Sequence, residues 1–258
     1  MSAPRPARCG LAARPLRRQR GLSLIELMVA ILIALFLIGG IIVVEQGVNL
    51  SYSQQNGLGQ LQDEERFAMS VLTSVIQTAG YFPNPTTNSQ VTALPASGNF
   101  AAGQAIWAPA SNAAAPYDSI DVRYMTEAGD GITLCDGSVA ATSTYTSDLY
   151  LAADTTGNGN YDLYCQLNGG TPVPLLDGLT NMQIYYGVAT GSDNNVTEYL
   201  ASKDVTAGGY WPDVTSVEVE LTFTNPLATQ GGQAVTGQPA TVTFKRVISV
   251  MSRVGTSQ

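Results

Sequence analysis

One carboxylate near the start of the chain stands out because its neighbours are almost all apolar. Glu26 interrupts an apolar run that extends from Leu22 to Val44 and directly follows Gly21. An acidic side chain within a membrane-length segment costs about 2.5–3.5 kcal/mol on insertion scales, and more on some simulation estimates. Such a group needs a partner, so the chemistry predicted here is charge pairing in surroundings of low dielectric constant.

A second candidate for chemistry is a glycine-rich segment near the middle of the chain. Oxygen-bearing side chains recur through it, at Asp154, Asn158, Asn160 and Asp162, and oxygen ligands from one loop suit Ca²⁺. The spacing does not follow the D-x-[DN]-x-[DN]-G calcium loop with its distant glutamate, and a tight hairpin uses the same residue types. We favour a hairpin turn and keep a weak calcium site as the alternative.

The composition argues against an enzyme. The chain contains no histidine, which removes the most common general base and the most common metal ligand. Glu218 and Glu220 lie on one face of a predicted strand, where alternation predicts solvent. Trp107 and Trp211 stand beside prolines, and we favour the edge of a core over a sugar-stacking role for both. No catalytic residue and no cofactor are predicted.

The N-terminal segment predicts a membrane orientation. Residues 1–21 contain six arginines and no acidic residue, and positive charge beside an apolar segment marks the side that stays in the cytoplasm. As a helix, residues 22–44 would reach about 35 Å, enough to cross a hydrocarbon core of about 30 Å. The run is too long for an ordinary secretory signal, and no A-x-A-like cleavage site follows it. A plain membrane anchor would also satisfy these observations.

The stretch GLSLIELMV at residues 21–29 resembles the class III signal of type IV prepilins. The resemblance implies that a prepilin peptidase cuts between Gly21 and Leu22, and that Leu22 becomes the N-methylated terminus. It also implies that Glu26, the fifth mature residue, pairs with the N-terminal amine of a neighbouring subunit. The sequence departs from the family at Leu22, where major pilins usually have phenylalanine, and in the length of the leader.

Removing the leader changes both the cysteine count and the charge. Cys9 leaves with it, and the remaining pair, Cys135 and Cys165, is typical of a disulfide in an exported domain, with two buried free thiols as the alternative. A disulfide between these two cysteines would close a loop of about thirty residues, which stabilises a fold by about 3–4 kcal/mol in the chain-entropy model. Six basic residues then face twenty acidic ones, a net charge near −14, which argues against a nucleic-acid partner.

The periodicity predicts an α+β fold, in which a long N-terminal helix packs on an antiparallel β-sheet as in type IV pilins. Apolar residues recur at helical spacing up to Ala79, and Gly80 supplies a stop. Asp121 and Arg123 alternate with apolar residues, as in a half-buried strand. Alternating or apolar patterns predict strands at 120–124, 149–153, 161–167, 182–188, 217–223 and 242–248. The expected domains are the leader (1–21), a transmembrane and assembly helix (22–44), an amphipathic helix (45–79) and a β-rich head (80–258), in which residues 83–116 show no period.

Further segments resemble PilW-type minor pilins, at residues 66–82, 176–187, 211–224 and 244–249. The resemblance implies a filament subunit that primes or caps a type IV pilus. Its implied partners are the prepilin peptidase, other major and minor pilins, the inner-membrane assembly platform and a tip adhesin. The head would be periplasmic before assembly and exposed on the pilus afterwards. Two alternatives stay open: a minor pseudopilin of type II secretion, and a tip-displayed adhesive module that binds through residues 83–116 and 154–162.

Overall fold

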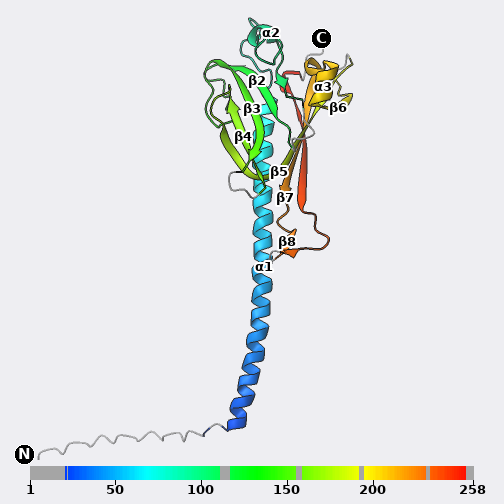
Figure 1. The fold of residues 1–258 in the computed structure, drawn as a ribbon. Coiled ribbons are helices and arrows are strands. Elements are labelled where there is room, and N and C mark those ends of the chain that lie inside the picture. Colours follow the sequence, from blue (N-terminus) through cyan, green and yellow to red (C-terminus); the bar gives the residue numbers. More distant parts are fainter. Residues whose placement is uncertain are drawn as a thin grey trace, which may run out of the picture. The chain divides into compact units, whose positions relative to one another are not determined.

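The computed structural model of the chain (Figure 1) describes residues 21, 23–110, 117–154, 159–191, 195–230 and 233–253. The chain divides between residues 53 and 54 into two compact units.

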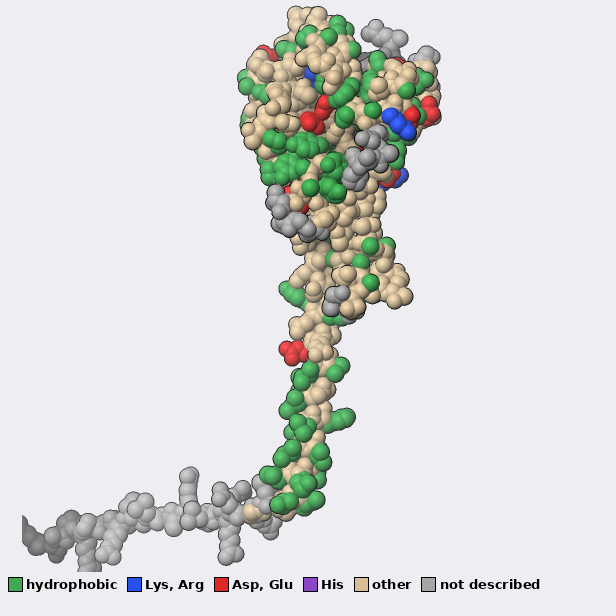
Figure 2. Space-filling model, in the orientation of Figure 1, with side chains coloured by type: hydrophobic (Ala, Val, Ile, Leu, Met, Phe, Trp, Pro, Cys, Tyr) green, Lys and Arg blue, Asp and Glu red, His purple; other side chains and the backbone are tan. Residues whose placement is uncertain are grey.

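The first unit is the N-terminal part of helix α1 (Leu24–Gln77), a helix of 54 residues. Large apolar side chains are exposed along it from Leu24 to Val48, and Figure 2 shows them gathered along this part of the helix. A helix that is apolar all round is stable when it is surrounded by lipid or by other apolar surfaces. Among the described residues, α1 is the one helix long and apolar enough to cross a membrane.

In the second unit, the C-terminal part of α1 contributes one apolar face to the core. Its buried side chains are Leu61, Ala68, Met69, Leu72, Val75 and Ile76. The chain leaves the helix through Gly80, whose φ of +74° is rarely adopted by residues with a side chain. A Cβ atom at this position would also collide with the Ser252 hydroxyl. The predicted amphipathic helix and its glycine stop are confirmed.

Within the described residues, eight strands form one antiparallel sheet in the order β1-β2-β3-β4-β5-β7-β10, with β6 paired to β5. The sheet strands are β1 (Ile106–Trp107), β2 (Ile120–Thr126), β3 (Ser143–Ala153), β4 (Tyr161–Leu167), β5 (Val173–Val188), β6 (Glu198–Ala201), β7 (Val214–Thr224) and β10 (Thr241–Ser249). The remaining elements are α2 (Gln90–Ala93), α3 (Ser202–Gly208), η1 (Trp211–Asp213), η2 (Met251–Arg253), and the two-stranded ribbon of β8 (Thr229–Gln230) and β9 (Gln233–Ala234).

All six predicted strands are present, and the predicted α+β architecture is confirmed. One strand, β5, is much longer than its alternating pattern indicated, because it serves two partners in succession. Its first part pairs with β4 (Leu163 opposite Leu176) and its second part with β7 (Ile184 opposite Val219), with register shifts in both pairings. The pattern failed to predict β6 and the short elements that follow it.

The second unit has one continuous hydrophobic core. Buried and less buried side chains alternate along much of β3, β4 and β7, as expected of a sheet with one covered face. The fully buried members of the core include Ile120, Val122, Leu149, Leu151, Leu163, Leu179, Val217, Val219 and Leu221. The apolar face of α1 belongs to the same core.

A buried arginine organises the segment that shows no sequence period. Arg123 of β2 is 2% exposed, although alternation predicted a half-buried strand with this residue on its polar side. Its guanidinium donates five hydrogen bonds of 2.7–3.3 Å to backbone carbonyls in the segment before β1, namely those of Leu94, Pro95, Ala101 and Gln104. The guanidinium also lies 4.7 Å from the ring centroid of Phe100. Because carbonyl dipoles and an aromatic face compensate the buried charge, Arg123 anchors the irregular segment to β2.

We predict that Arg123→Met lowers the free energy of unfolding by about 3 kcal/mol, because several buried carbonyls lose a charged donor at once. Urea denaturation of the full-length protein in detergent measures the change. Arg66→Met, at an exposed position on α1, is the matched control and should change stability by no more than about 0.5 kcal/mol. Equal effects of the two substitutions would show that Arg123 is no special anchor.

Candidate functional site

Glu26 lies in the first turn of α1, five residues after Gly21 of the predicted cleavage position. Ser23 caps the helix: its carbonyl accepts the backbone N–H groups of Glu26 (3.1 Å) and Leu27 (3.2 Å), and its Oγ accepts the N–H of Glu26 at 3.3 Å. Such a cap satisfies donors that have no partner within the helix. Gly21 is exposed just before this turn, and Leu22 lies outside the described residues. The helix begins at Leu24, three residues after Gly21.

The sequence analysis missed this cap, although the spacing of Ser23 and Glu26 is that of a capping box. A carboxylate in the first turn of a helix is favoured by the helix dipole, typically by about 0.3–1 kcal/mol. The Glu26 side chain is exposed, and none of the ion pairs found among the described residues includes it. The described part of the chain thus supplies no cation for this carboxylate.

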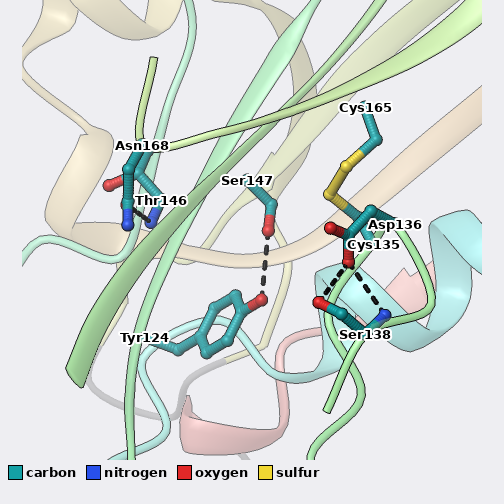
Figure 3. The surroundings of a disulfide bond; sticks show 8 residues. All are labelled: Tyr124, Cys135, Asp136, Ser138, Thr146, Ser147, Cys165 and Asn168. Carbon is teal, nitrogen blue, oxygen red and sulfur yellow. Dashed lines mark hydrogen bonds between the residues drawn. A yellow bond between two sulfur atoms is a disulfide. The ribbon is translucent and has the colours of Figure 1, made fainter. Parts of the chain in front are cut away.

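A disulfide joins Cys135, in the connection between β2 and β3, to Cys165 in β4 (Figure 3). The two Cα atoms are 6.0 Å apart, and the cysteines are 30 residues apart in the sequence. Next to the bridge, the Asp136 carboxylate accepts the backbone N–H of Ser138 at 2.9 Å and its hydroxyl at 2.6 Å, which closes a local turn. The predicted disulfide is confirmed, and it fixes an irregular connection to the sheet.

We predict that replacing both Cys135 and Cys165 with serine lowers the free energy of unfolding by about 3 kcal/mol, since the unfolded chain regains the freedom of the closed loop. Chemical denaturation with and without a reducing agent measures this loss. The reducing agent should destabilise the wild-type protein but leave the double variant unchanged. A double variant as stable as the wild type would contradict the prediction.

The strands on either side of the glycine-rich segment, β3 and β4, pair as an antiparallel hairpin. The backbone N–H of Asp154 donates to the carbonyl of Asn160 at 3.1 Å, so the hairpin interpretation is confirmed, and residues 155–158 of its loop lie outside the described residues. Burial raises the pKa of Asp162, and the nearby carboxylates of Asp154 and Asp177 raise it further. Asn158 lies outside the described residues. Where the chain is described, no three acidic, histidine or cysteine side chains are placed to hold a metal ion, and the weak calcium site stays a prediction.

Glu218 and Glu220 are less exposed than alternation predicted. Lys245 of β10 reaches both, at 3.1 Å from Glu218 Oε1 and 2.5 Å from Glu220 Oε1. Only 19% and 17% of the two glutamate side chains are exposed. Hydrogen bonds to Glu220 and Glu218 raise the pKa of Lys245. The expected solvated face is therefore a charge cluster, created because the strand register sets Lys245 opposite Glu220.

The two tryptophans lie at or near the edges of the core. The Trp211 ring packs edge-on against Tyr186, with ring centroids 4.9 Å apart, and its Nε1 donates to Thr206 Oγ1 at 3.1 Å. Trp107 is partly buried on the short edge strand β1. Trp211 therefore has the structural role that the sequence analysis favoured.

Comparisons with known proteins match two separate parts of the chain. Residues 141–250 match the family described as Type IV Pilus-assembly protein W, and residues 16–42 match the Prokaryotic N-terminal methylation motif. A solved type IV-like pilin from Thermus thermophilus is similar at 15% sequence identity and a TM-score of 0.40, over 74% of this chain and 97% of that one. No curated protein sequence matches significantly. The first match spans β3 to β10, and the second includes the predicted cleavage position and Glu26.

Proposed function

We propose that the chain is a PilW-like type IV pilin with a class III signal, and that it acts as a minor pilin that primes or caps pilus assembly. In this role it is a non-enzymatic filament subunit. The observation that carries the proposal is the start of α1, where a capped first turn presents Glu26 at the head of an exposed apolar helix. A subunit of this kind acts through the surfaces that it offers to its neighbours.

Processing precedes assembly in this proposal. A prepilin peptidase removes residues 1–21 on the cytoplasmic side and methylates Leu22, as expected from the match to the methylation motif. The apolar part of α1 then holds the subunit in the inner membrane, with the head in the periplasm. On assembly, the helices of neighbouring subunits take the place of lipid around the same apolar surface. The surface stays in apolar surroundings, so its transfer from the membrane to the filament costs little solvation free energy.

The capped helix start explains why cleavage would license docking. Cleavage creates a positively charged amine at Leu22, close to the positive end of the helix dipole, where a cation is disfavoured and a carboxylate is favoured. Pairing this amine with Glu26 of a neighbouring subunit neutralises both groups in low-dielectric surroundings. One charge without the other is strongly unfavourable there. The pair would therefore set the axial register of adjacent subunits, and it cannot form before the leader is removed.

The head domain is the part of the subunit through which we expect it to contact specific partners. The PilW match covers much of it, and a family of type IV pilus-assembly proteins favours a type IV pilus over a type II secretion machine. Other major and minor pilins and the inner-membrane assembly platform are the proposed partners, with a tip adhesin as a further one. The acid excess of the mature chain disfavours nucleic acid as a partner.

We predict that Glu26→Ala lowers the number of pili per cell at least about tenfold, because a neighbouring amine then lacks its counter-charge. Electron microscopy counts the pili, and affinity purification tests whether the other minor pilins still co-purify. Glu45→Ala, which removes an exposed acid farther along the same helix, is the matched control and should behave as wild type. Normal piliation with normal co-purification in Glu26→Ala would overturn this role for the carboxylate.

We also predict that the mature protein begins with N-methylated Leu22. Mass spectrometry of the N-terminal peptide from membrane fractions identifies the residue and the added methyl group. Gly21→Val should retain the leader, because the resemblance to prepilins implies a small residue at the junction. An intact leader on the wild-type protein, or a terminus elsewhere, would contradict the prediction.

A further inference from the structure

Two carboxyl groups oppose each other across neighbouring strands of the head. Asp121 of β2 and Asp148 of β3 are directly opposite in the antiparallel register, so their carboxyl groups lie side by side on one face of the sheet, close enough to interact. Two ionised carboxylates have no donor between them, so a hydrogen bond between the two side chains requires a proton on one of them. Without that proton, two like charges would face each other directly across the strands, which destabilises a sheet.

The cross-strand neighbours of the pair carry no charge that could replace the proton. Trp107 of β1 lies opposite Asp121, and Gln166 of β4 lies opposite Asp148. The two acids are therefore the central members of a row that crosses four strands. Within the described residues, none of the ion pairs includes either acid.

Other titratable groups near the pair are acids or phenols. The carboxylate of Asp118 precedes β2 and accepts the backbone N–H of Ile184 at 2.9 Å. Tyr150 of β3 interacts electrostatically with Asp148, and Tyr186 of β5 interacts with Asp118 and Asp121. None of these groups supplies a positive charge, so the surroundings favour the protonated pair.

The nearest cation on the same strand, Arg123, donates its hydrogen bonds to other groups. Arg123 lies two residues beyond Asp121, and its five hydrogen bonds all go to backbone carbonyls of residues 94–104. Burial, followed by the charge of Asp148 and the hydrogen bond to it, raises the pKa of Asp121 to about 7. Burial also raises the pKa of Asp148. The pair therefore gains or loses its proton near neutral pH, and the pH around an exposed domain can pass through this range.

We propose that the proton shared by Asp121 and Asp148 is a pH-sensitive clasp that holds β2 against β3 and is lost when the surroundings become alkaline. The consequence reaches beyond the two strands because β2 anchors other parts of the head. Arg123 ties the irregular segment to β2, and the backbone N–H of Gly80, at the exit of α1, donates to the Arg123 carbonyl at 2.9 Å. Loss of the clasp therefore loosens the part of the head in which the irregular segment meets the sheet.

The sign of the effect follows from linkage. An unfolded aspartate loses its proton near pH 3.9, whereas folded Asp121 keeps it to about pH 7. The stability that the proton contributes is complete below the unfolded pKa, declines as the pH rises toward the folded pKa, and is absent above it. Carboxylates with lowered pKa values make the free energy of unfolding rise with pH, which is the opposite trend. A comparison with a matched variant is therefore needed to isolate the contribution of the clasp.

Urea denaturation of the full-length protein in detergent at several pH values from 5 to 8 tests the proposal. In Asp121→Asn, the side-chain amide donates to Asp148 at every pH. Relative to this variant, the unfolding equilibrium constant of the wild type should rise by up to about tenfold per pH unit between pH 5 and 7. Asp63→Asn, at an exposed position on α1, should keep the wild-type dependence. Identical pH dependence in wild type and Asp121→Asn would overturn the clasp.

Hydrogen exchange of the wild-type protein tests the same proposal without relying on a variant that folds. After correction for the intrinsic exchange rate, the amides of β2 and β3 should lose protection from pH 6 to pH 8. The amides paired between β7 and β10 should keep their protection, since no acid pair bridges those strands in the described register. A uniform change across all four strands, or none, would overturn a local clasp.

Discussion

The apolar face of α1 between Leu61 and Ile76 is the contact on which the head depends. It shares one core with the inner face of the sheet, and each fully buried leucine or isoleucine contributes roughly 1.5–3 kcal/mol relative to an exposed one. The same hydrogen-bonded backbone continues toward the N-terminus, where the side chains are apolar on every side. One helix therefore satisfies two demands: its second part completes a protein core, and its first part needs lipid or neighbouring helices.

The irregular parts of the head are held by a few strong contacts. Residues 83–105 and the connection between β2 and β3 contain little regular structure, so strand ladders cannot satisfy most of their backbone. The first segment is held by the charged hydrogen bonds of Arg123, and the second by the disulfide of Cys135 and Cys165. Charge-assisted hydrogen bonds and covalent bridges need little buried apolar area, which suits segments rich in small and polar residues.

Acidic side chains serve the protein in three different settings, and the neighbour decides the state of each. Glu26 stands in an apolar segment, and in the proposed filament it meets an amine from another subunit. Glu218 and Glu220 share Lys245 across a strand pair. Asp121 and Asp148 have no ion-pair partner in the part of the chain that the structure describes, and in the proposed clasp they share a proton instead. A chain without histidine can thus still respond to pH near neutrality, because burial and a like-charged neighbour move a carboxyl group into that range.

The sequence by itself determined the long helix up to Gly80, six strands, the cysteine pair and the acidic residue behind Gly21. Each of these depends on a local period, a residue count or a short motif, and such features can be recognised in the sequence without knowledge of the fold. It could not predict that Arg123 is buried under the irregular segment, that Lys245 meets two glutamates, or that Asp121 faces Asp148. Strand order and register decide these neighbours, and both arise from contacts between residues far apart in the chain. The tertiary structure therefore decided how each charge is solvated, because solvation depends on which distant groups displace water from it.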